Sequence, residues 1–329
     1  MYLSTTLWPL VMALAHLSAP IPPQPTIRYN VEFGQGTIAA SKPVPIRRPL
    51  LMDVYSPSYA IKGDARPAII LAFGGSFHRG TRGDTHFTEG GARDSSMAEY
   101  CRFFALNGYV CFAIDYRLTP EDPAPDRIVD ASIMTDRSVI LSAAATARID
   151  VARTQMGLPP LDEISRPQYW RSMVSATQDM QTAFEYISAH EARYAIDKKH
   201  IAIGGFSAGA ITAINAVYGL KVPAKAVISI SGAYGVYDIA KTAKHGDPPL
   251  LSFTGQYDLP GIILGTQAVA SVLETQQISH KNAEARGFAH FYPMGVLTSV
   301  ENSAPMTIEG RMLEFLHDNG LTPKASRLP

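Results

Sequence analysis

One serine interrupts an apolar stretch of the chain and has glycines on either side. Residues 201–216 read IAIGGFSAGAITAINA, in which Ser207 stands between Gly205 and Gly209. A serine in such a position either caps a helix through its hydroxyl or acts as a nucleophile. The second role requires a base and a carboxylate that orients the base, because a serine hydroxyl alone is a poor nucleophile.

The residues around this serine predict a strand, a tight turn and a helix. Ile201–Ile203 is a short apolar run typical of strands buried on both faces, and apolar residues recur at helical spacing over Ala210–Tyr218. Residues 205–209 (GFSAG) fit the pattern G-x-S-x-G, in which small residues allow a sharp turn that holds the serine in a strained conformation. The start of the helix places free N–H groups beside the hydroxyl.

Strands and helices alternate along most of the chain. Two strands come first, and the glycines at 34 and 36 predict a bend or bulge in the first of them. The predicted strands cover residues 27–38, 49–55, 67–73, 109–114, 201–203, 226–230, 250–253 and 283–286. Helices are predicted at residues 96–106, 173–190, from 210, at 266–275 and at 306–318. This alternation is typical of an α/β fold whose mostly parallel sheet carries helices on both faces.

Residues 118–172 break the alternation where a short connection would suffice. Helical patches such as residues 142–155 stand between prolines in this segment. We expect a partly helical insertion that folds over one end of the sheet as a lid or cap, the alternative being an elaborated loop.

A glycine pair follows the third predicted strand, in the sequence LAFGGSFHRG. Glycines at a strand end let backbone N–H groups approach a ligand closely, which suits an oxyanion hole. Together with the serine turn, this loop resembles the α/β-hydrolase family of serine esterases, particularly its carboxylesterase and hormone-sensitive-lipase-like members. Their loop reads His-Gly-Gly-Gly, and Phe73 and Ser76 depart from that pattern. The resemblance implies that the N–H groups of Gly75, Ser76 and Ala208 hold the oxyanion.

The resemblance extends over nearly all of residues 48–290. The stretches that carry it, in the family's order and spacing, are DVYSP at 53–57, NGYVCFAIDYRLTP at 107–120, QDMQTAFEYISAHEARYAIDKKHIAIGGFSAG at 178–209 and PPLLSFTGQYD at 248–258. These motifs together favour the nucleophile over the helix cap as the role of the serine.

The resemblance also implies that an acid and then a histidine follow Ser207 along the chain. His290 stands in GFAHFYPMG, the loop after the last predicted strand, where the family places its base. Asp258 ends the turn after the strand at 250–253, at the sheet edge where open α/β sheets bind ligands. We therefore predict a triad of Ser207, Asp258 and His290.

Other acids and histidines fit the triad less well. His245 and His280 are expected to be solvated surface residues, and His317 belongs to the terminal helix. The remaining acid candidates lie before the relevant strand or within the last one, and they are Asp238, Asp247 and Glu284.

The expected reaction is hydrolysis of small or medium neutral carboxylic esters. His290 would take the proton from Ser207 as the hydroxyl attacks the ester carbonyl, Asp258 would fix the imidazole tautomer, and water would release the acyl-enzyme. No metal and no organic cofactor is required. Acyltransfer or peptide hydrolysis on the same triad is one alternative, and a non-catalytic ligand-binding protein of the same fold is another.

Weaker predictions concern residues beside these groups. Phe77, His78 and Tyr292 are candidates for substrate binding, or they simply pack. Asp115 and Arg117 are expected to form a structural ion pair beneath the site.

Composition excludes several classes of protein. The 329 residues are 46% hydrophobic, and 29 Lys and Arg balance 29 Asp and Glu, so neither a nucleic-acid footprint nor a polybasic membrane patch is expected. No apolar run is long enough to span a membrane. We expect one hydrolase domain at residues 25–329, in an oligomeric state that the sequence leaves open.

The first residues predict export. An apolar segment at residues 7–17 is followed by small residues and prolines, which indicates a signal peptide at residues 1–19 and a secreted or extracytoplasmic protein. Cleavage after Ala15 competes with cleavage after Ala19, which Pro20 disfavours. No Lys or Arg precedes the segment, so a loose tail is the alternative. The two cysteines, Cys101 and Cys111, are expected to be buried thiols rather than a disulfide.

Overall fold

A computed structural model describes residues 24–58 and 65–324, and ten strands of these residues form one sheet. The predicted signal peptide lies outside the described residues. The order across the sheet is β1-β2-β6-β3-β7-β8-β9-β10-β11-β12. Its strands are β1 (Thr26–Ile38), β2 (Ile46–Ser56), β3 (Arg66–Ala72), β6 (Val110–Ile114), β7 (Ile196–Phe206), β8 (Ala226–Ile230), β9 (Leu250–Gly255), β10 (His280–Ala285), β11 (Leu297–Ser299) and β12 (Met306–Thr307).

The six central strands, from β6 to β10 across the sheet, run parallel. Every residue of β3, β6 and β8 is buried, which explains their continuous apolar runs, because a strand covered on both faces has no polar side. The outer strands pair antiparallel at both edges. The sheet therefore confirms the mostly parallel α/β architecture expected from the sequence.

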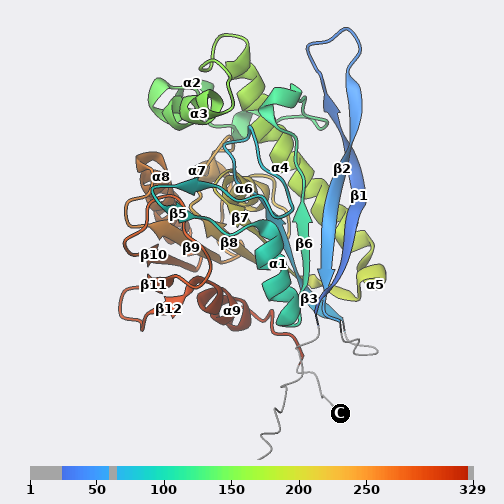
Figure 1. Cartoon of the computed structure of the whole chain (residues 1–329), viewed down its shortest axis with the longest axis vertical. Coiled ribbons are helices and arrows are strands. Elements are labelled where there is room, and N and C mark those ends of the chain that lie inside the picture. Colours follow the sequence, from blue (N-terminus) through green and yellow to red (C-terminus); the bar gives the residue numbers. More distant parts are fainter. Residues whose placement is uncertain (1–23, 59–64, 325–329) are drawn as a thin grey trace, which may run out of the picture.

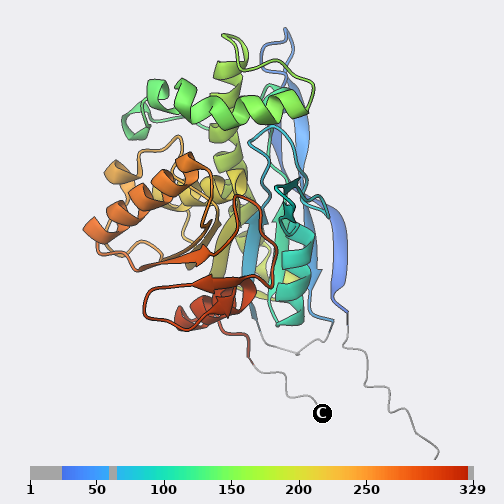
Figure 2. The same ribbon diagram turned by 60° about the vertical axis from the view of Figure 1, so that its left-hand side comes forward.

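Helices lie on both faces of the sheet (Figures 1 and 2). The chain moves from β3 to β6 in one direction across the sheet and from β6 to β10 in the other, so right-handed crossovers place the connecting helices on opposite faces. Helices α1 (Met97–Leu106) and α9 (Ile308–Asp318) cover one face, and α4 (Ser165–Ala189) and α6 (Ala208–Ile214) cover the other. The other α-helices of the described residues are α2 (Arg137–Ile140), α3 (Ala143–Gln155), α5 (Glu191–Tyr194), α7 (Ile239–Thr242) and α8 (Pro260–Thr275), and a π-helical stretch at Asn215–Gly219 continues α6.

Local signals account for several helix ends. Ser96 and Glu99 form a capping box at the start of α1. Helix α4 begins at Ser165, eight residues earlier than the sequence pattern predicted. Pro167 lies in the first turn of this helix, where a missing N–H leaves no intrahelical bond unmade. None of the helices in the described part of the chain is long and apolar enough to cross a membrane.

The segment at residues 118–172 forms α2, α3, two short 3₁₀ turns and the start of α4. Figures 1 and 2 show α2 and α3 beyond one end of the sheet. Its first part is fixed to the body by the pairing of Met134 with Tyr237, and Thr135 N donates to Val236 O at 2.9 Å. The insertion is thus ordered against the loop after β8.

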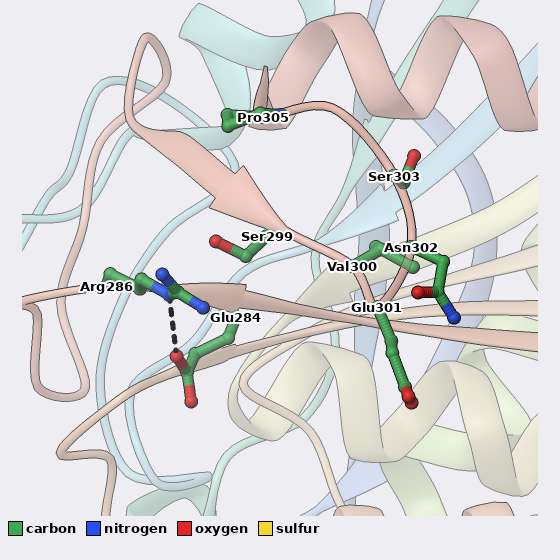
Figure 3. Close-up of a pocket in the computed structure, with 8 residues that line it drawn as sticks. All are labelled: Glu284, Arg286, Ser299, Val300, Glu301, Asn302, Ser303 and Pro305. Atoms are coloured by element: carbon green, nitrogen blue, oxygen red, sulfur yellow. Dashed lines mark ion pairs between the residues drawn. The ribbon is translucent and has the colours of Figure 1, made fainter.

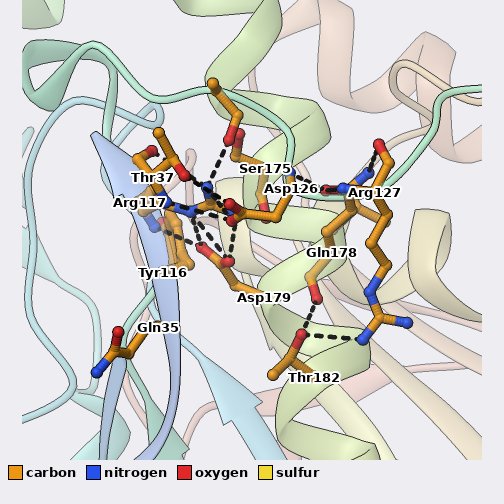
Figure 4. Close-up of polar contacts among 12 residues, drawn as sticks. Gln35, Thr37, Tyr116, Arg117, Asp126, Arg127, Ser175, Gln178, Asp179 and Thr182 are labelled. Atoms are coloured by element: carbon orange, nitrogen blue, oxygen red, sulfur yellow. Dashed lines mark hydrogen bonds and ion pairs between the residues drawn. The ribbon is translucent and has the colours of Figure 1, made fainter. Parts of the chain in front are cut away.

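A buried ion network anchors the base of this insertion (Figure 4). The guanidinium of Arg117, fully buried, lies 2.7 Å from Asp179 of α4 and 2.7 Å from Asp126 of the insertion. A Cβ on Gly36 would lie 2.4 Å from Arg117 Nε, so the glycine is required by this close approach. The network joins the β1–β2 hairpin, the insertion and α4.

The expected pairing of Asp115 with Arg117 is wrong. Asp115 pairs with Arg82, which also binds Asp53 at 2.9 Å, whereas Arg117 turns to Asp179. Asp115 and Arg117 are two positions apart after β6, but their side chains contact partners on different elements. Both charges nevertheless have the structural role that was predicted.

The expectation for the two cysteines is also wrong, because Cys101 and Cys111 form a disulfide. Cys101 lies in α1 and Cys111 in β6, and their Cα atoms are 5.1 Å apart. The packing of α1 on β6 brings the two side chains together, and the sequence spacing alone does not reveal that approach. The bond ties the helix to the strand that follows it.

Candidate active site

Ser207 stands at the junction of β7 and α6 in a strained backbone conformation, with φ 50° and ψ −114°. Cβ atoms on Gly205 and Gly209 would lie 2.4 Å and 2.0 Å from Ala72 O, so only glycine fits at either position. The Ser207 N–H donates to Ile230 O at 2.8 Å, which fixes the turn against β8. The glycines predicted to permit a sharp turn therefore do so, and the serine is partly exposed at the carboxyl end of the strand.

His290 connects Ser207 to Asp258. The serine Oγ lies 3.0 Å from His290 Nε2, and His290 Nδ1 lies 2.6 Å from Asp258 Oδ1. The carboxylate accepts a hydrogen bond from Nδ1–H, which leaves Nε2 without a proton and able to accept the serine proton. The imidazole and the carboxylate are 5% and 4% exposed, which shields this hydrogen-bond chain from water. The structure thus brings together the three residues predicted as the triad.

Asp258 is held by groups that the sequence analysis did not identify. Its Oδ2 accepts hydrogen bonds from Ser231 Oγ at 2.6 Å and from Gly255 N at 3.1 Å, and Leu259 N donates to Oδ1 at 2.8 Å. Ser231 follows β8 directly, at the same sheet edge as the other polar groups, and this position is the signal that points to it. These donors favour a carboxylate in one orientation.

Tyr292, a candidate for substrate binding, is buried, which favours the alternative that it packs. Tyr292 is 1% exposed, and its hydroxyl lies 2.7 Å from Ser231 Oγ, behind the acid. Burial and the nearby charge of Asp258 hold the pKa of Tyr292 well above its usual range, so the phenol keeps its proton. The Ser231 hydroxyl donates a hydrogen bond to Asp258, so the Tyr292 hydroxyl donates its hydrogen bond to Ser231 Oγ. Tyr292 supports the acid rather than a ligand.

The loop after β3 forms a tight turn beside the elbow. Gly75 has φ +127°, and its carbonyl accepts from His78 N at 3.0 Å and from Arg79 N at 3.2 Å. Because an amide's N–H points away from its C=O, these bonds direct the Ser76 N–H outward. Within the described residues, the N–H groups of Gly75 and Ser76 make no hydrogen bond to the protein. Both are therefore available to an oxyanion, and Ala208, the first residue of α6, adds a helix-start N–H.

Phe77 and His78 are buried rather than open to a ligand, at 1% and 2% exposure. The Phe77 ring packs edge-on against Tyr116 and Tyr169. The His78 ring faces Tyr169 and bonds on both sides to protein groups. The substrate-contacting role predicted for these two side chains does not fit this burial, which favours the alternative that they pack.

The alternative acids and histidines lie elsewhere. Asp247 pairs with Lys221 at 2.6 Å, and Asp238 caps α7. His245 is exposed, as expected, and His280 is partly buried with its Nδ1 near Ile278 O.

Aromatic rings surround the imidazole. Phe206 and Phe291 lie 5.2 Å and 5.1 Å from the His290 ring, and Phe87 lies 6.2 Å from Phe291. Helix α3 meets the same region, where Arg148 Nη1 donates to Glu89 Oε1 at 2.9 Å. Apolar rings beside the histidine exclude water and strengthen its hydrogen bond to the acid.

Two pockets lie away from these residues. One, of about 460 Å³, is lined by residues between Glu284 and Pro305 at the β10–β11 edge, and none of the predicted site residues lines it (Figure 3). The other, of about 300 Å³, is lined by Trp170 and residues of the 129–137 segment of the insertion.

Known proteins similar to this chain include esterases. Residues 162–304 match the phospholipase/carboxylesterase family. Comparison with curated proteins finds no match. Among solved structures, esterase 2 of Thermogutta terrifontis phosphorylated by paraoxon is similar at 18% identity and a TM-score of 0.56, over 93% of this chain and 98% of that chain. Its propionate-bound form is similar at 16% identity and a TM-score of 0.55, with the same coverage.

These likenesses confirm the fold class that the sequence predicted, since the structures share the architecture over almost their whole length. The family match covers the elbow serine, the acid and the base in one continuous stretch. The chain therefore has the α/β-hydrolase fold, and its residues 162–304 are similar to the phospholipase/carboxylesterase family.

Proposed function

We propose that this protein hydrolyses small or medium neutral carboxylic esters through a Ser207-His290-Asp258 triad. The observation that carries the proposal is the unbroken chain of hydrogen bonds, 3.0 Å from serine to imidazole and 2.6 Å from imidazole to carboxylate. The three residues lie within residues 162–304, which are similar to the phospholipase/carboxylesterase family.

The reaction follows from the positions of these groups. Ser207 Oγ attacks the ester carbonyl carbon while its proton passes to His290 Nε2, and the carbonyl oxygen becomes an oxyanion facing the N–H groups of Gly75, Ser76 and Ala208. The proton on Nε2 then goes to the leaving alkoxide, which departs as the alcohol. Water repeats the sequence on the acyl-enzyme and releases the acid. Asp258 stabilises the imidazolium at each stage.

The test is Ser207→Ala, which removes only the nucleophile because the glycines set the turn. Hydrolysis of p-nitrophenyl acetate should fall by several orders of magnitude. A fluorophosphonate probe, or paraoxon, should label Ser207 in the wild type and not in the variant. A variant that keeps more than about a tenth of wild-type turnover would exclude the assignment. A wild type that takes no label would favour a non-catalytic binding protein.

We also propose that the protein is exported. The apolar segment at residues 7–17 supports this, and so does the disulfide between Cys101 and Cys111, since such bonds persist in oxidising compartments. N-terminal sequencing of the protein secreted by its host would test the proposal, and an intact Met1 on intracellular protein would contradict it.

A further inference from the structure

The oxyanion loop contains two non-glycine residues in the left-handed region. Ser76 has φ 59° and Phe77 has φ 57°, and together they form the centre of the turn closed by His78 N and Gly75 O. A side chain with a Cβ disfavours this conformation, which glycine or asparagine usually supplies. Additional contacts must therefore hold the loop in the shape that presents the Ser76 N–H.

The His78 ring supplies one such contact on each of its nitrogens. Nδ1 lies 2.8 Å from Ser76 O, and Nε2 lies 3.1 Å from Arg153 Nη1. A carbonyl oxygen only accepts and a guanidinium only donates, so the ring must be neutral, with its proton on Nδ1. No other protonation state satisfies both partners.

The two partners belong to separate parts of the protein. Ser76 lies in the loop after β3, whereas Arg153 lies in α3 of the insertion, where its Nε donates to Pro159 O at 2.6 Å. His78 and Arg153 are 2% and 6% exposed, so water does not compete for these bonds. The ring is thus a bridge between the oxyanion loop and the insertion.

We propose that His78 is a positioning residue for ester hydrolysis, which holds the oxyanion loop in its donating conformation by joining Ser76 to Arg153 of the insertion. The proposal rests on the proposed function and deepens it. The bond to Ser76 O fixes the peptide that follows Ser76 and so stabilises the left-handed pair. The insertion would therefore contribute to the turnover number as well as to substrate choice.

The electrostatic surroundings agree with a neutral ring. Burial is the main cause that lowers the pKa of His78 to about 4. The bond to Ser76 and the charge of Asp150 act in the opposite direction, whereas Arg153 and Arg79 lower the pKa further. His78 therefore stays unprotonated at neutral pH.

Two substitutions separate the two bonds. Asparagine places a side-chain amide near the position of Nδ1, so His78→Asn keeps a donor for Ser76 O. Glutamine reaches only the position of Nε2, so His78→Gln keeps an acceptor for Arg153 and loses the bond to Ser76. Arg153→Met removes the link from His78 to the insertion, and Arg148→Gln is the control, since it breaks a different α3 contact, to Glu89.

Steady-state kinetics with p-nitrophenyl acetate and inhibition by a trifluoromethyl ketone provide the readouts. The ketone forms an adduct with Ser207 whose oxyanion occupies the same hole. We expect His78→Gln to lower kcat about tenfold with KM changed less than about twofold. The affinity for the ketone should fall by the same factor as kcat. His78→Asn should keep most of the wild-type kcat and ketone affinity. Arg153→Met should lose less of each than His78→Gln does, and Arg148→Gln should change kcat less than about twofold.

Three results would overturn the inference: an unchanged kcat in folded His78→Gln, equal losses in the asparagine and glutamine variants, or a fall in kcat without a matching loss of ketone affinity. Circular dichroism establishes that each variant is folded. If Ser207→Ala is inactive and the His78 variants behave as wild type, only this inference fails. If Ser207→Ala is active, the proposed function fails, and this inference fails with it.

Discussion

At the scale of single residues, the candidate site is a hydrogen-bond chain that extends behind the triad. Tyr292 donates to Ser231, Ser231 donates to Asp258, and Asp258 accepts from His290. Every member is 5% exposed or less, so each bond acts in a medium of low polarisability. Such a chain holds the carboxylate where the imidazole needs it.

Asp258→Asn tests the acid directly. The amide can still contact His290, but it favours the tautomer with the proton on Nε2, which cannot accept from Ser207. We expect kcat to fall by about three to four orders of magnitude with the fold intact. Asp247→Asn is the control, since Asp247 pairs with Lys221 away from the site. A greater loss of kcat in Asp247→Asn than in Asp258→Asn would show that Asp258 is not the acid of the triad.

Ser231→Ala and Tyr292→Phe test the supporting chain. Loss of the Ser231 hydroxyl leaves Asp258 Oδ2 with the Gly255 N–H alone, so kcat should fall about tenfold, in proportion to the loss of one bond to a charged group. Tyr292→Phe should cause a smaller fall, of a few fold. The neighbouring Tyr257, which is 66% exposed, gives the control Tyr257→Phe. Turnover equal to wild type in Ser231→Ala would show that the chain does not support the acid.

At the scale of elements, the insertion meets the catalytic body through α3. Arg153 bonds to His78, Arg148 bonds to Glu89, and Gln155 accepts from Arg79 at 2.7 Å. All three contacts fall on the segment at residues 78–89, which follows the oxyanion loop. The insertion is therefore placed to select substrates and to exclude water, as lids do.

Replacing residues 130–156 with a short Gly-Ser linker should change the order in which p-nitrophenyl esters are preferred by acyl length. It should also slow labelling of Ser207 by a small fluorophosphonate without abolishing it, because the triad does not depend on these residues. The measurements are kcat/KM across the ester series and the labelling rate. An unchanged order of preference would exclude a lid, and no labelling in a folded variant would make the segment part of the catalytic centre.

At the scale of the whole molecule, burial of His78 makes stability depend on pH. The folded pKa, about 4, is below the ordinary value of 6.5, so the unfolded chain binds the proton more readily. Stability from this group is complete above about pH 6.5 and is lost as the pH falls towards 4. The shift corresponds to about 3 kcal/mol.

His78→Gln should abolish this contribution, since glutamine does not titrate. The difference in free energy of unfolding between wild type and variant should therefore shrink by up to about 3 kcal/mol between pH 7 and pH 4. Urea denaturation at several pH values measures it, and contributions from other groups cancel in the difference. A difference that is constant across this range would show that His78 titrates normally in the folded protein.

The sequence predicted the parts of this molecule that depend on local pattern. The elbow at Ser207 follows from glycine spacing and Asp258 from its place after a strand, whereas the choice of His290 rests on the family resemblance. The features that the sequence did not predict depend on tertiary contacts. Arg117 meets Asp179 from 62 residues away, and Cys101 meets Cys111 only because α1 packs on β6. Likewise, the packing of the loop after β10, not its composition, turns Tyr292 towards Ser231.

The order of the central strands has a consequence for how activity reports on folding. Neighbouring strands β3, β7, β8, β9 and β10 are followed in turn by the loop proposed to hold the oxyanion, by Ser207, by Ser231, by Asp258 and by His290. No pair of strands adjacent in sequence carries all of these groups, so the proposed site requires the assembled sheet. Turnover should therefore disappear in the same cooperative transition as the sheet itself, which makes a colorimetric ester a direct gauge of the assembled fold.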